Sequence, residues 1–557
     1  MKKQIPFLLL LFLSFSQNMS AQQTMGLFLN DSLSVNGYTL FANSRITYLI
    51  DNCGNLVNTW ESNFVSNTSN YLLENGDLLR TARVAGSFTG GGSAGRVELF
   101  NWDGDLLWSY NYATPEYHLH HDIEPLPNGN ILILAWEAYT EAEAIEEGRN
   151  PGAISNGGIW PEQIVEVEMV GTNEINIVWE WRAWDHLVQE HDNSKNNYGI
   201  VADHPELIDI NYGEISGGFP GGNPDWIHAN AIDYNPELDQ IAISSRHFDE
   251  IWIIDHSTTT AEAAGHTGGN AGKGGDLLYR WGNPEVYQRG DDDDQTLWGQ
   301  HNVTWILEED HPHYGKLLVF NNGLGRPGGN FSSIDLWTPP MEGDYNYSIG
   351  NSAPFGPVEA DWSYSEPGFY SINISGVHAL PGGNFFVCEG TSGHFFEVTL
   401  DGEVVWDYIN PVSASSGPQT QTTNPSSNST FRATRYPAGY AAFENKDLTP
   451  GAPIELNPLP SDCIIFEGPV TSIEEEKIWQ GAWLRNNPVS NFLTIINETN
   501  GPVNVEVFDL TGRQILHQKS FDREVVMNVI DWIDGFYLLR ISGPDKTQSF
   551  TQKFVKN

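Results

Sequence analysis

Short hydrophobic segments that carry tryptophan, each followed by a turn, recur along the first three quarters of the chain. Each segment is typical of a β-strand. A unit of this size cannot bury its apolar face alone, whereas an array of such units can. The six segments are Leu56–Glu61, Asp105–Tyr112, Ile175–Trp184, Asp276–Asn283, Val358–Glu366 and Glu403–Asn410.

Hairpins recur with the tryptophan strands. In the clearest unit, His120–Pro127 and Ile131–Glu137 flank a tight Asn-Gly-Asn turn, and Gln163–Val170 and Ile175–Trp184 complete four antiparallel strands. The other predicted hairpins are Leu72–Arg80, His228–Ser244, Asn302–Phe320, Val377–Val387 and Phe431–Phe443. Six hairpins and six tryptophan strands predict an all-β fold, a six-bladed β-propeller.

The two ends of this array predict how it closes. The first tryptophan strand precedes the first complete hairpin, and the hairpin Phe431–Phe443 has no tryptophan strand after it. We therefore expect the two halves to complete one blade, which removes the free edges of the ring.

The composition changes after residue 465. Six short alternating strands between Phe492 and Val555 predict a small C-terminal β-sandwich. At the other end, Lys2 and Lys3 precede the apolar run Pro6–Phe15 and a cleavage site after Ala21, as in a secretory signal peptide. The predicted organisation is a signal peptide at 1–21, a propeller at 22–465, a linker at 466–485 and a sandwich at 486–557.

Charge and hydropathy narrow the functional classes. The net charge of −45 disfavours nucleic-acid binding, because phosphate backbones would be repelled, and fits a protein that stays soluble outside the cell. An anionic substrate would then need a local cationic pocket. The apolar run of the signal is too short to span a bilayer, and no other segment is predicted to cross a membrane once the signal is removed. We therefore expect an exported protein, either secreted or held at the cell surface.

Three cysteines fit an exported protein, in which disulfides are permitted. Cys53 lies near the start of the ring and Cys463 near its end, so a bridge and a pair of free thiols both remain open. Cys388 lies in an apolar strand and is expected to be buried.

Histidines open the first strands of three successive predicted blades. They are His120 with His121, then His228, then His301. The second strand of a blade runs back to the same face, so Arg246, at the end of such a strand, is expected beside His228. Glu389, Thr391, Asn321 and Asn322 end other second strands in the same way. The sequence therefore predicts one pocket at the mouth of the central channel.

Several neutral imidazoles around one arginine suit a tetrahedral oxyanion. The guanidinium supplies fixed, permanently charged donors, and histidine can donate, accept or attack as a nucleophile. His378 is out of phase with this set. The remaining histidines are assigned to packing or the surface: His118, His247, His256, His266, His311, His313, His394 and His517.

Metal catalysis is disfavoured. His118, His120 and Asp122 form the one group with ligand-like spacing, and an arginine among the ligands would repel a cation. The acidic run Asp291–Asp294 fits a solvated loop better than a calcium site. No cofactor is predicted.

Three motifs together resemble bacterial aryl-sulfate sulfotransferases, which need no nucleotide sulfate donor. The motifs are His120–Asn130, then Asp225–Asn230 with Ser244–Arg246, then Gln300–Asn302. The resemblance spans most of residues 40–450 and implies a six-bladed propeller. Some members of that family have a β-sandwich ahead of the propeller that helps to assemble a dimer. In this sequence only about 15 residues separate the predicted signal from the first predicted strands, so we do not expect dimerisation by that route.

The resemblance also implies residue roles. His301 corresponds to the nucleophile that carries the sulfuryl group as sulfohistidine. His228, Asn230 and Arg246 correspond to residues that bind sulfate and the leaving group. A further histidine of the family's site corresponds to either His120 or His121. Asn302 belongs to the nucleophile's motif, and Thr391 and Glu389 are weaker matches.

The last 70 residues resemble the C-terminal sorting domain of type IX secretion. The matching segments are Asn487-Pro488-Val489, Val507–Arg513, Gly535-Phe536-Tyr537 and Lys553-Phe554-Val555. The resemblance implies passage across an outer membrane and the type IX secretion machinery as a partner. The alternative is an ordinary accessory module.

These features predict a sulfotransferase that moves a sulfuryl group from a phenolic sulfate to a phenol by a two-step, ping-pong route. Two alternatives stay open: a non-catalytic surface propeller that binds sulfated glycans or proteins, and a hydrolase that passes the group to water.

Overall fold

The computed structural model describes residues 22–154, 158–213, 224–308 and 311–466, and most of the chain from 482 to 556. In that last stretch residues 486–488, 490, 498–500, 509–512, 531, 534 and 544–548 are left out. Contacts divide the chain into two compact units, Met1–Pro469 and Val470–Asn557, which are described separately. The predicted signal at 1–21 and residues 467–481 of the predicted linker lie outside the described residues.

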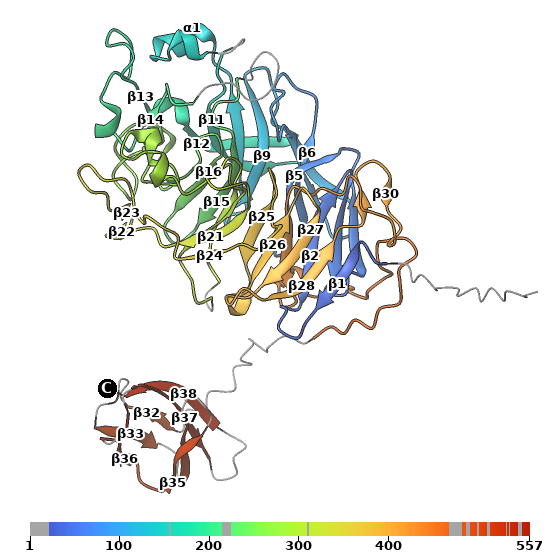
Figure 1. Ribbon diagram of the computed structural model, residues 1–557, viewed down its shortest axis with the longest axis vertical. Coiled ribbons are helices and arrows are strands. Elements are labelled where there is room, and N and C mark those ends of the chain that lie inside the picture. The colour runs from blue at the N-terminus through green and yellow to red at the C-terminus, as the bar shows by residue number, and fades with distance from the viewer. Residues whose placement is uncertain are drawn as a thin grey trace, which may run out of the picture. The chain divides into compact units, whose positions relative to one another are not determined.

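Most described strands of the first unit form six antiparallel sheets of four or five strands (Figure 1). The first three in chain order are β5 (Ser66–Leu72), β6 (Leu78–Arg83), β7 (Gly95–Phe100), β8 (Leu106–Asn111); β9 (Tyr117–Pro125), β10 (Ile131–Glu137), β11 (Glu162–Val170), β12 (Glu174–Arg182); and β15 (Ala229–Asn235), β16 (Gln240–Ser245), β17 (Glu250–Asp255), β18 (Tyr279–Trp281).

The other three sheets complete the unit. They are β19 (His301–Trp305), β20 (Leu317–Asn321), β21 (Ser333–Trp337), β24 (Trp362–Tyr364); β25 (Gly376–Ala379), β26 (Phe385–Glu389), β27 (His394–Val398), β28 (Val404–Ile409) with β1 (Gly26–Asn30) at its edge; and β31 (Ala433–Pro437), β2 (Gly37–Asn43), β3 (Ile46–Asp51), β4 (Leu56–Glu61).

Shorter elements lie in connections within these sheets and between them. They are α1 (Glu141–Glu146), α2 (Thr260–Ala263), β13 (Leu187–Val188), β14 (Ile208–Asp209), β22 (Met341–Glu342), β23 (Asn346–Tyr347), β29 (Val412–Ser413) and β30 (Gly417–Pro418). No helix among the described residues combines the length and the apolar character needed to cross a membrane.

The tryptophan repeat marks the fourth strand of every sheet. In each case an indole N–H, of a tryptophan that is buried or, for Trp362, partly buried, donates across to the connection between the third and fourth strands of the next sheet. This bond satisfies the polar end of a large apolar side chain. The donors and acceptors are Trp60 to Asn101, Trp108 to Glu174, Trp179 to Thr258, Trp281 to Pro357, Trp362 to Leu400 and Trp406 to Asn52. The last bond, from Trp406 to Asn52, returns to the sheet that contains Trp60, so the six bonds form a closed circuit.

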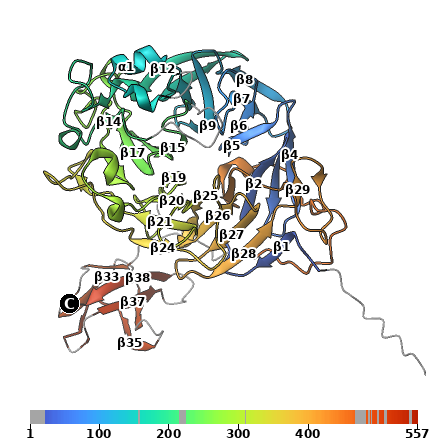
Figure 2. The ribbon, with the colours of Figure 1, turned by 45° about the horizontal axis from the view of Figure 1, so that its top comes forward.

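The innermost strands follow the same circuit. Figure 2 shows β5, β9, β15, β19 and β25 next to one another around a common centre, and each contacts the next. Strand β31 contacts β26, and β2, its partner, contacts β5. The described residues form a mostly β structure, in agreement with the predicted class apart from the short helices α1 and α2, and the arrangement is propeller-like.

The closing sheet corrects one predicted hairpin. Of Phe431–Phe443 only Ala433–Pro437 is a strand, and Ala441–Phe443 is a 3₁₀ turn. The N-terminal strand β2 pairs with β31, from Gly37 opposite Pro437 to Phe41 opposite Ala433. Because β2 occupies the neighbouring place in the sheet, residues after Pro437 have no ladder to join. Both ends of the array do contribute to one sheet, as predicted.

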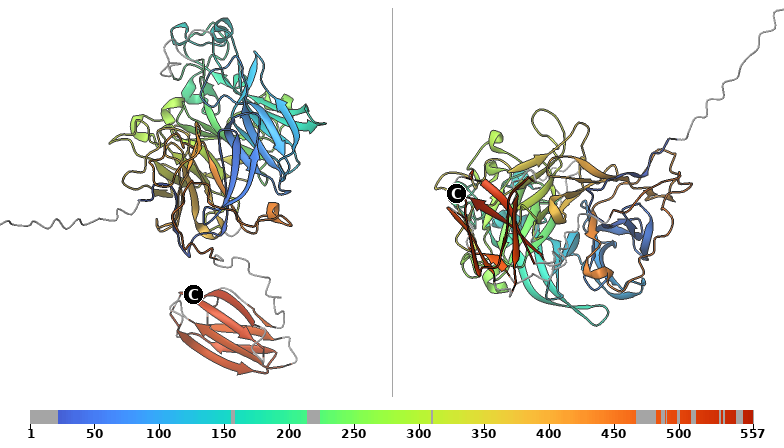
Figure 3. Two further views of the ribbon diagram at one scale, coloured as in Figure 1. Left: turned by 90° about the vertical axis from the view of Figure 1, so that its right-hand side faces the viewer. Right: turned by 90° about the horizontal axis from the view of Figure 1, so that it is seen from below.

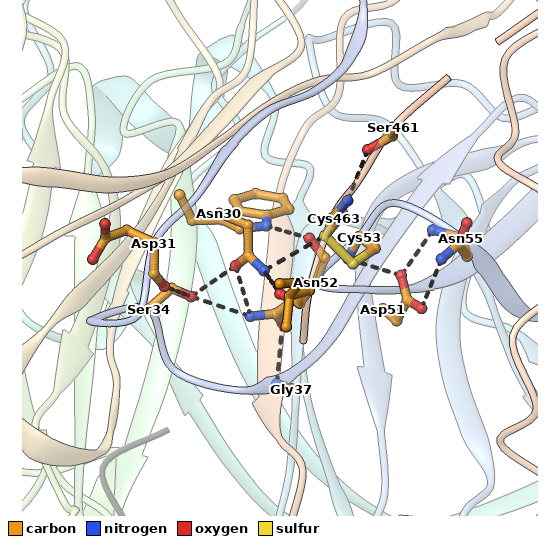
Figure 4. The surroundings of a disulfide bond; sticks show 12 residues. Asn30, Asp31, Ser34, Gly37, Asp51, Asn52, Cys53, Asn55, Ser461 and Cys463 are labelled. Atoms are coloured by element: carbon orange, nitrogen blue, oxygen red, sulfur yellow. Dashed lines mark hydrogen bonds between the residues drawn. A yellow bond between two sulfur atoms is a disulfide. The ribbon is translucent and has the colours of Figure 1, made fainter. Parts of the chain in front are cut away.

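Of the two alternatives left open for Cys53 and Cys463, the structure contains the disulfide bond. Cys53, in the turn after β3, bonds to Cys463, 410 residues later (Figure 4). Beside it, Nδ2 of Asn30 donates to the carbonyl of Ile464, and the Cys53 N–H donates to Asp51. Cys388 is free and fully buried, which confirms that prediction.

The C-terminal unit contains two sheets that enclose one hydrophobic core (red in Figure 3). The strands are β32 (Ala482–Leu484), β33 (Phe492–Asn497) and β36 (Glu524–Asn528), and β35 (Gln514–Ser520), β34 (Val503–Phe508), β37 (Gly535–Ser542) and β38 (Ser549–Lys556). β32 lies within the segment 466–485 that the sequence assigns to the linker, and it pairs with β33.

Candidate active site

A cavity of about 680 Å³ opens where the innermost strands of the first unit begin. All six sheets contribute to it, from these strands or the residues just before them. Its lining is Asn67, Thr68, Gly91, Gly92, His121, Asp225, His228, Arg246, His247, His301, Asn373, Ile374, Ser429 and Phe431. His121, His228, Arg246 and His301, all predicted from the sequence, are therefore brought together.

Backbone irregularities aim the histidines at this cavity. The pairings of β9, β15 and β19 with their second strands each shift register at or next to the site residues. His121, His228 and Asn302 have φ values of 52°, 53° and 56°. Left-handed backbone is uncommon for such residues, and a bulge redirects a side chain out of the sheet pattern. The same distortion therefore recurs in three consecutive sheets.

His301 is held as one neutral tautomer. Its Nδ1 lies 2.7 Å from Oδ1 of Asn322 and 3.1 Å from the carbonyl oxygen of Gly299, and because both are acceptors Nδ1 carries the proton. Its Nε2 accepts the N–H of Ile374 at 3.2 Å. Burial, reinforced by the Arg246 guanidinium, lowers the pKa of His301 to about 3. Its Nε2 lone pair is therefore available at neutral pH.

His228 is paired with a buried carboxylate. Its Nδ1 lies 2.5 Å from Oδ2 of Asp225, whose Oδ1 accepts the indole N–H of Trp136. Burial, followed by neighbouring His247 and Arg246, holds the pKa of His228 well below its usual value. Its ring lies next to Gly91, which also lines the cavity. A histidine oriented in this way by a carboxylate is suited to accept a proton at Nε2.

The sequence left the choice between His120 and His121 open, and the geometry separates them. His121 lines the cavity, and its ring centroid lies 4.6 Å from that of His228. A side chain at Gly92 would clash with this ring, because a Cβ there would lie 2.3 Å from it. His120 lies behind it, fully buried and stacked on Trp136, with Nε2 2.7 Å from Glu162.

Arg246 is the single arginine among the described lining residues, which include no lysine. Its guanidinium makes no hydrogen bond or ion pair within the described part of the chain, whereas nearby Arg432 is paired with Asp122 at 3.0 Å. Burial lowers the pKa of Arg246, and the carboxylates of Asp249 and Asp225 oppose that shift. The cavity therefore contains one arginine whose guanidinium has neither a hydrogen bond nor an ion pair among the described residues.

Four predicted substrate-binding residues do not line the cavity. Asn230 is fully buried and its Nδ2 donates to the carbonyl of Gln300 at 2.7 Å. Oδ1 of Asn302 accepts the N–H of Val377. Thr391 hydrogen-bonds to Ser371, and Glu389 contacts His394 at 3.2 Å.

His247 was assigned to packing or the surface, and that assignment is wrong. It lines the cavity and stacks on His228 with ring centroids 4.6 Å apart. Strand β16 ends at Ser245, so the alternation of strand side chains does not apply to the next two residues, and both reach the cavity. The direct adjacency of His247 to Arg246 was the available signal.

Comparisons with known proteins identify the family. Residues 16–432, more than half of the chain, match the family described as Arylsulfotransferase (ASST). The chain therefore belongs to the arylsulfotransferase family. Residues 487–557 match the secretion system C-terminal sorting domain, which indicates export across the outer membrane to the cell surface by the type IX machinery.

No curated protein matches the chain. Among solved structures, a protein of unknown function from Bacteroides caccae is 11% identical with a TM-score of 0.37, covering 72% of this chain and 99% of its own. A virginiamycin B lyase from Staphylococcus aureus with quinupristin is 10% identical (TM-score 0.29, 70% and 89%). A streptogramin B lyase is 12% identical (TM-score 0.31, 70% and 86%). Likeness at this level carries no argument about activity.

Proposed function

We propose that the first unit is a six-bladed propeller whose cavity transfers a sulfuryl group from a phenolic sulfate ester to a phenol, through a sulfohistidine at His301. One observation carries the proposal: a neutral imidazole, fixed with its proton on Nδ1, shares a cavity with the guanidinium of Arg246, which has no ion pair among the described residues. Membership of the arylsulfotransferase family supports it. The alternatives of a glycan-binding module and a hydrolase have no comparable observation in their favour.

In the first step, the sulfate oxygens of the donor face Arg246. This cation offsets their charge within a chain of net charge −45. Nε2 of His301 attacks sulfur; the N–S bond forms, the bond from sulfur to the phenolic oxygen breaks, and the electron pair leaves with the phenolate. The Ile374 N–H, which donates to Nε2 in the resting site, is then free to donate to a sulfuryl oxygen.

In the second step, an acceptor phenol loses its proton to Nε2 of His228 as its oxygen attacks sulfur. The N–S bond breaks and His301 regains its lone pair. The new imidazolium faces Asp225, which stabilises its charge, and the proton later passes to a departing phenolate or to solvent. His121 and His247 are proposed to donate hydrogen bonds to the sulfate or to the leaving oxygen.

The buried neighbours are proposed to position these groups. His120 supports His121 from behind, and Asn230 holds the carbonyl of Gln300, next to the nucleophile. Asn302 fixes the turn after His301 to Val377. Thr391 and Glu389 are proposed to hold the loops at the rim. The signal at 1–21 and the sorting domain at 486–557 are proposed to deliver the propeller, residues 22–465, to the outside of the cell.

The test is to incubate the protein with 4-nitrophenyl sulfate and analyse peptides at alkaline pH for an SO₃ adduct. The adduct is expected on His301, and the His301→Ala variant should lose both the adduct and phenol release. His378→Ala is the matched control, because His378 is a histidine of an innermost strand that does not line the cavity.

Dependence on the acceptor separates the alternatives. Phenol release that rises with added acceptor phenol supports transfer. Release that is independent of acceptor would indicate a hydrolase, and binding without release would indicate a binding module. Near-normal turnover by His301→Ala would refute the nucleophile assignment.

A further inference from the structure

Two histidines and an aspartate from distant parts of the chain converge at a second place in the first unit. His186 lies just before β13, His266 lies in the connection from α2 to β18, and Asp276 lies just before β18. Nδ1 of His186 is 2.8 Å from Oδ1 of Asp276, and Nδ1 of His266 is 2.7 Å from the same oxygen. None of the three lines the candidate active site.

The orientation of His186 is fixed from the other side of its ring. Nε2 lies 2.8 Å from the carbonyl oxygen of Ala263, so Nε2 carries a proton. The ring also lies nearly parallel to that of Trp181, at 7° and a centroid distance of 5.8 Å. In metal sites the second ring nitrogen of a histidine ligand commonly donates to a carbonyl in this way. The remaining nitrogen of His186 therefore points at the carboxylate.

This arrangement calls for a cation between the three groups. In the neutral tautomer, the Nδ1 lone pair of His186 would face a carboxylate oxygen, which is repulsive. A proton or a metal ion relieves that repulsion. One ligand atom from each residue lies within 4.8 Å of the others, and His266 is 61% exposed, so solvent can reach the site.

We propose that His186, His266 and Asp276 bind a Zn²⁺ ion, with water completing the coordination. Two imidazoles and one carboxylate suit Zn²⁺ in an oxidising exterior. Tetrahedral ligands at zinc bond lengths lie about 3.3 Å apart. The present separations of 2.7 and 2.8 Å need only a small expansion, which the exposed side chain of His266 can supply.

The ion would fasten a glycine-rich loop to the unit. Residues 265–275 contain six glycines, and a loop of this composition loses much entropy when it is ordered. The loop already packs closely at Gly275, where a Cβ would lie 2.6 Å from Nε2 of His186. Zn²⁺ would cross-link His266, near the start of this loop, and Asp276, directly after it, to His186.

The experiment uses the full-length protein, stripped with a chelator and titrated with Zn²⁺ against a chromophoric competitor. We expect one site whose affinity falls at least about tenfold in His266→Ala, which removes an exposed side chain and leaves the fold intact. His204→Ala is the matched control, because the side chain of His204 is partly exposed and pairs with one carboxylate, that of Glu206 at 3.0 Å.

The candidate active site offers a competing group of potential ligands, Asp225, His228 and His247. Unchanged Zn²⁺ affinity in His266→Ala, or a loss confined to His247→Ala, would overturn the proposal. As a second readout, Zn²⁺ should slow tryptic cleavage after Lys273, within the loop, in the wild type and not in His266→Ala. Equal cleavage of the wild type with and without Zn²⁺ would also overturn it.

Discussion

The pKa of His301 makes an unusual pH dependence the sharpest test of the proposed nucleophile. Burial, reinforced by Arg246, lowers this pKa to about 3. A depressed histidine pKa means that the ring is neutral, and therefore nucleophilic, at every pH well above 3. An ordinary imidazole, with a pKa of about 6.5, would be mostly protonated at pH 5.

The expected difference is large. At pH 5, about 99% of an imidazole of pKa 3 is neutral, against about 3% for one of pKa 6.5. The value of kcat/KM for a donor with a good leaving group, such as 4-nitrophenyl sulfate, should therefore change less than about twofold between pH 7.5 and pH 5. It would fall about 30-fold if His301 were unperturbed.

The assay is a set of initial rates at low donor concentration, quenched into alkali so that released 4-nitrophenol is measured as its anion. Circular dichroism at each pH checks that the protein remains folded, because other buried neutral histidines, such as His120, destabilise it as the pH falls. His301→Ala supplies the background rate. A decline in kcat/KM that follows an apparent pKa near 6.5 would contradict the assigned state of His301.

Three further variants test the proposed sulfate-binding arginine, the disulfide and a histidine outside the candidate site. Arg246→Lys should lower kcat/KM by about 10- to 100-fold, because planar paired donors are replaced by a point charge; an unchanged rate would remove its sulfate role. Changing Cys53 and Cys463 to Ser together should lower the free energy of unfolding by about 2–4 kcal/mol in urea titrations, and an unchanged midpoint would count against the bond. Burial alone would lower the pKa of His256, but hydrogen bonds to Asp239 and Glu166 raise it to about 9. The stabilisation it provides is complete below pH 6.5 and lost as the pH rises through 9. His256→Gln should therefore lower the free energy of unfolding by roughly 2–3 kcal/mol at pH 7 and by much less at pH 9; a cost independent of pH would contradict this.

Much of the fold was predictable because its signals are local and repeated. A tryptophan such as Trp60 recurs at the same place in every sheet, and each indole performs the same task at the next connection. Closure by the two chain ends followed from counting strands. The failure at Phe431–Phe443 has a non-local cause: β2, almost 400 residues earlier in the chain, occupies the place where a second strand would lie.

The sequence was sufficient to predict which strand ends meet at the candidate site, but not which side chains point into it. His228, His301 and Arg246 follow from the rule that first strands begin, and second strands end, at one face. Phase could not separate His120 from His121, because the bulge in β9 breaks the alternation at that point. Nor could it place His247, which lies beyond the end of β16, where no periodicity applies.

The sequence by itself thus determined the repeating strands, the closed array, the C-terminal sorting domain and the cluster of imidazoles around a guanidinium, because periodicity and spacing are properties of short segments. Only the tertiary structure decided which imidazole faces the cavity, that Asp225 supports His228 and Asn322 supports His301, and that Cys53 meets Cys463. These choices depend on register shifts and on contacts between distant segments, which fix the direction of a side chain only when the whole array has closed.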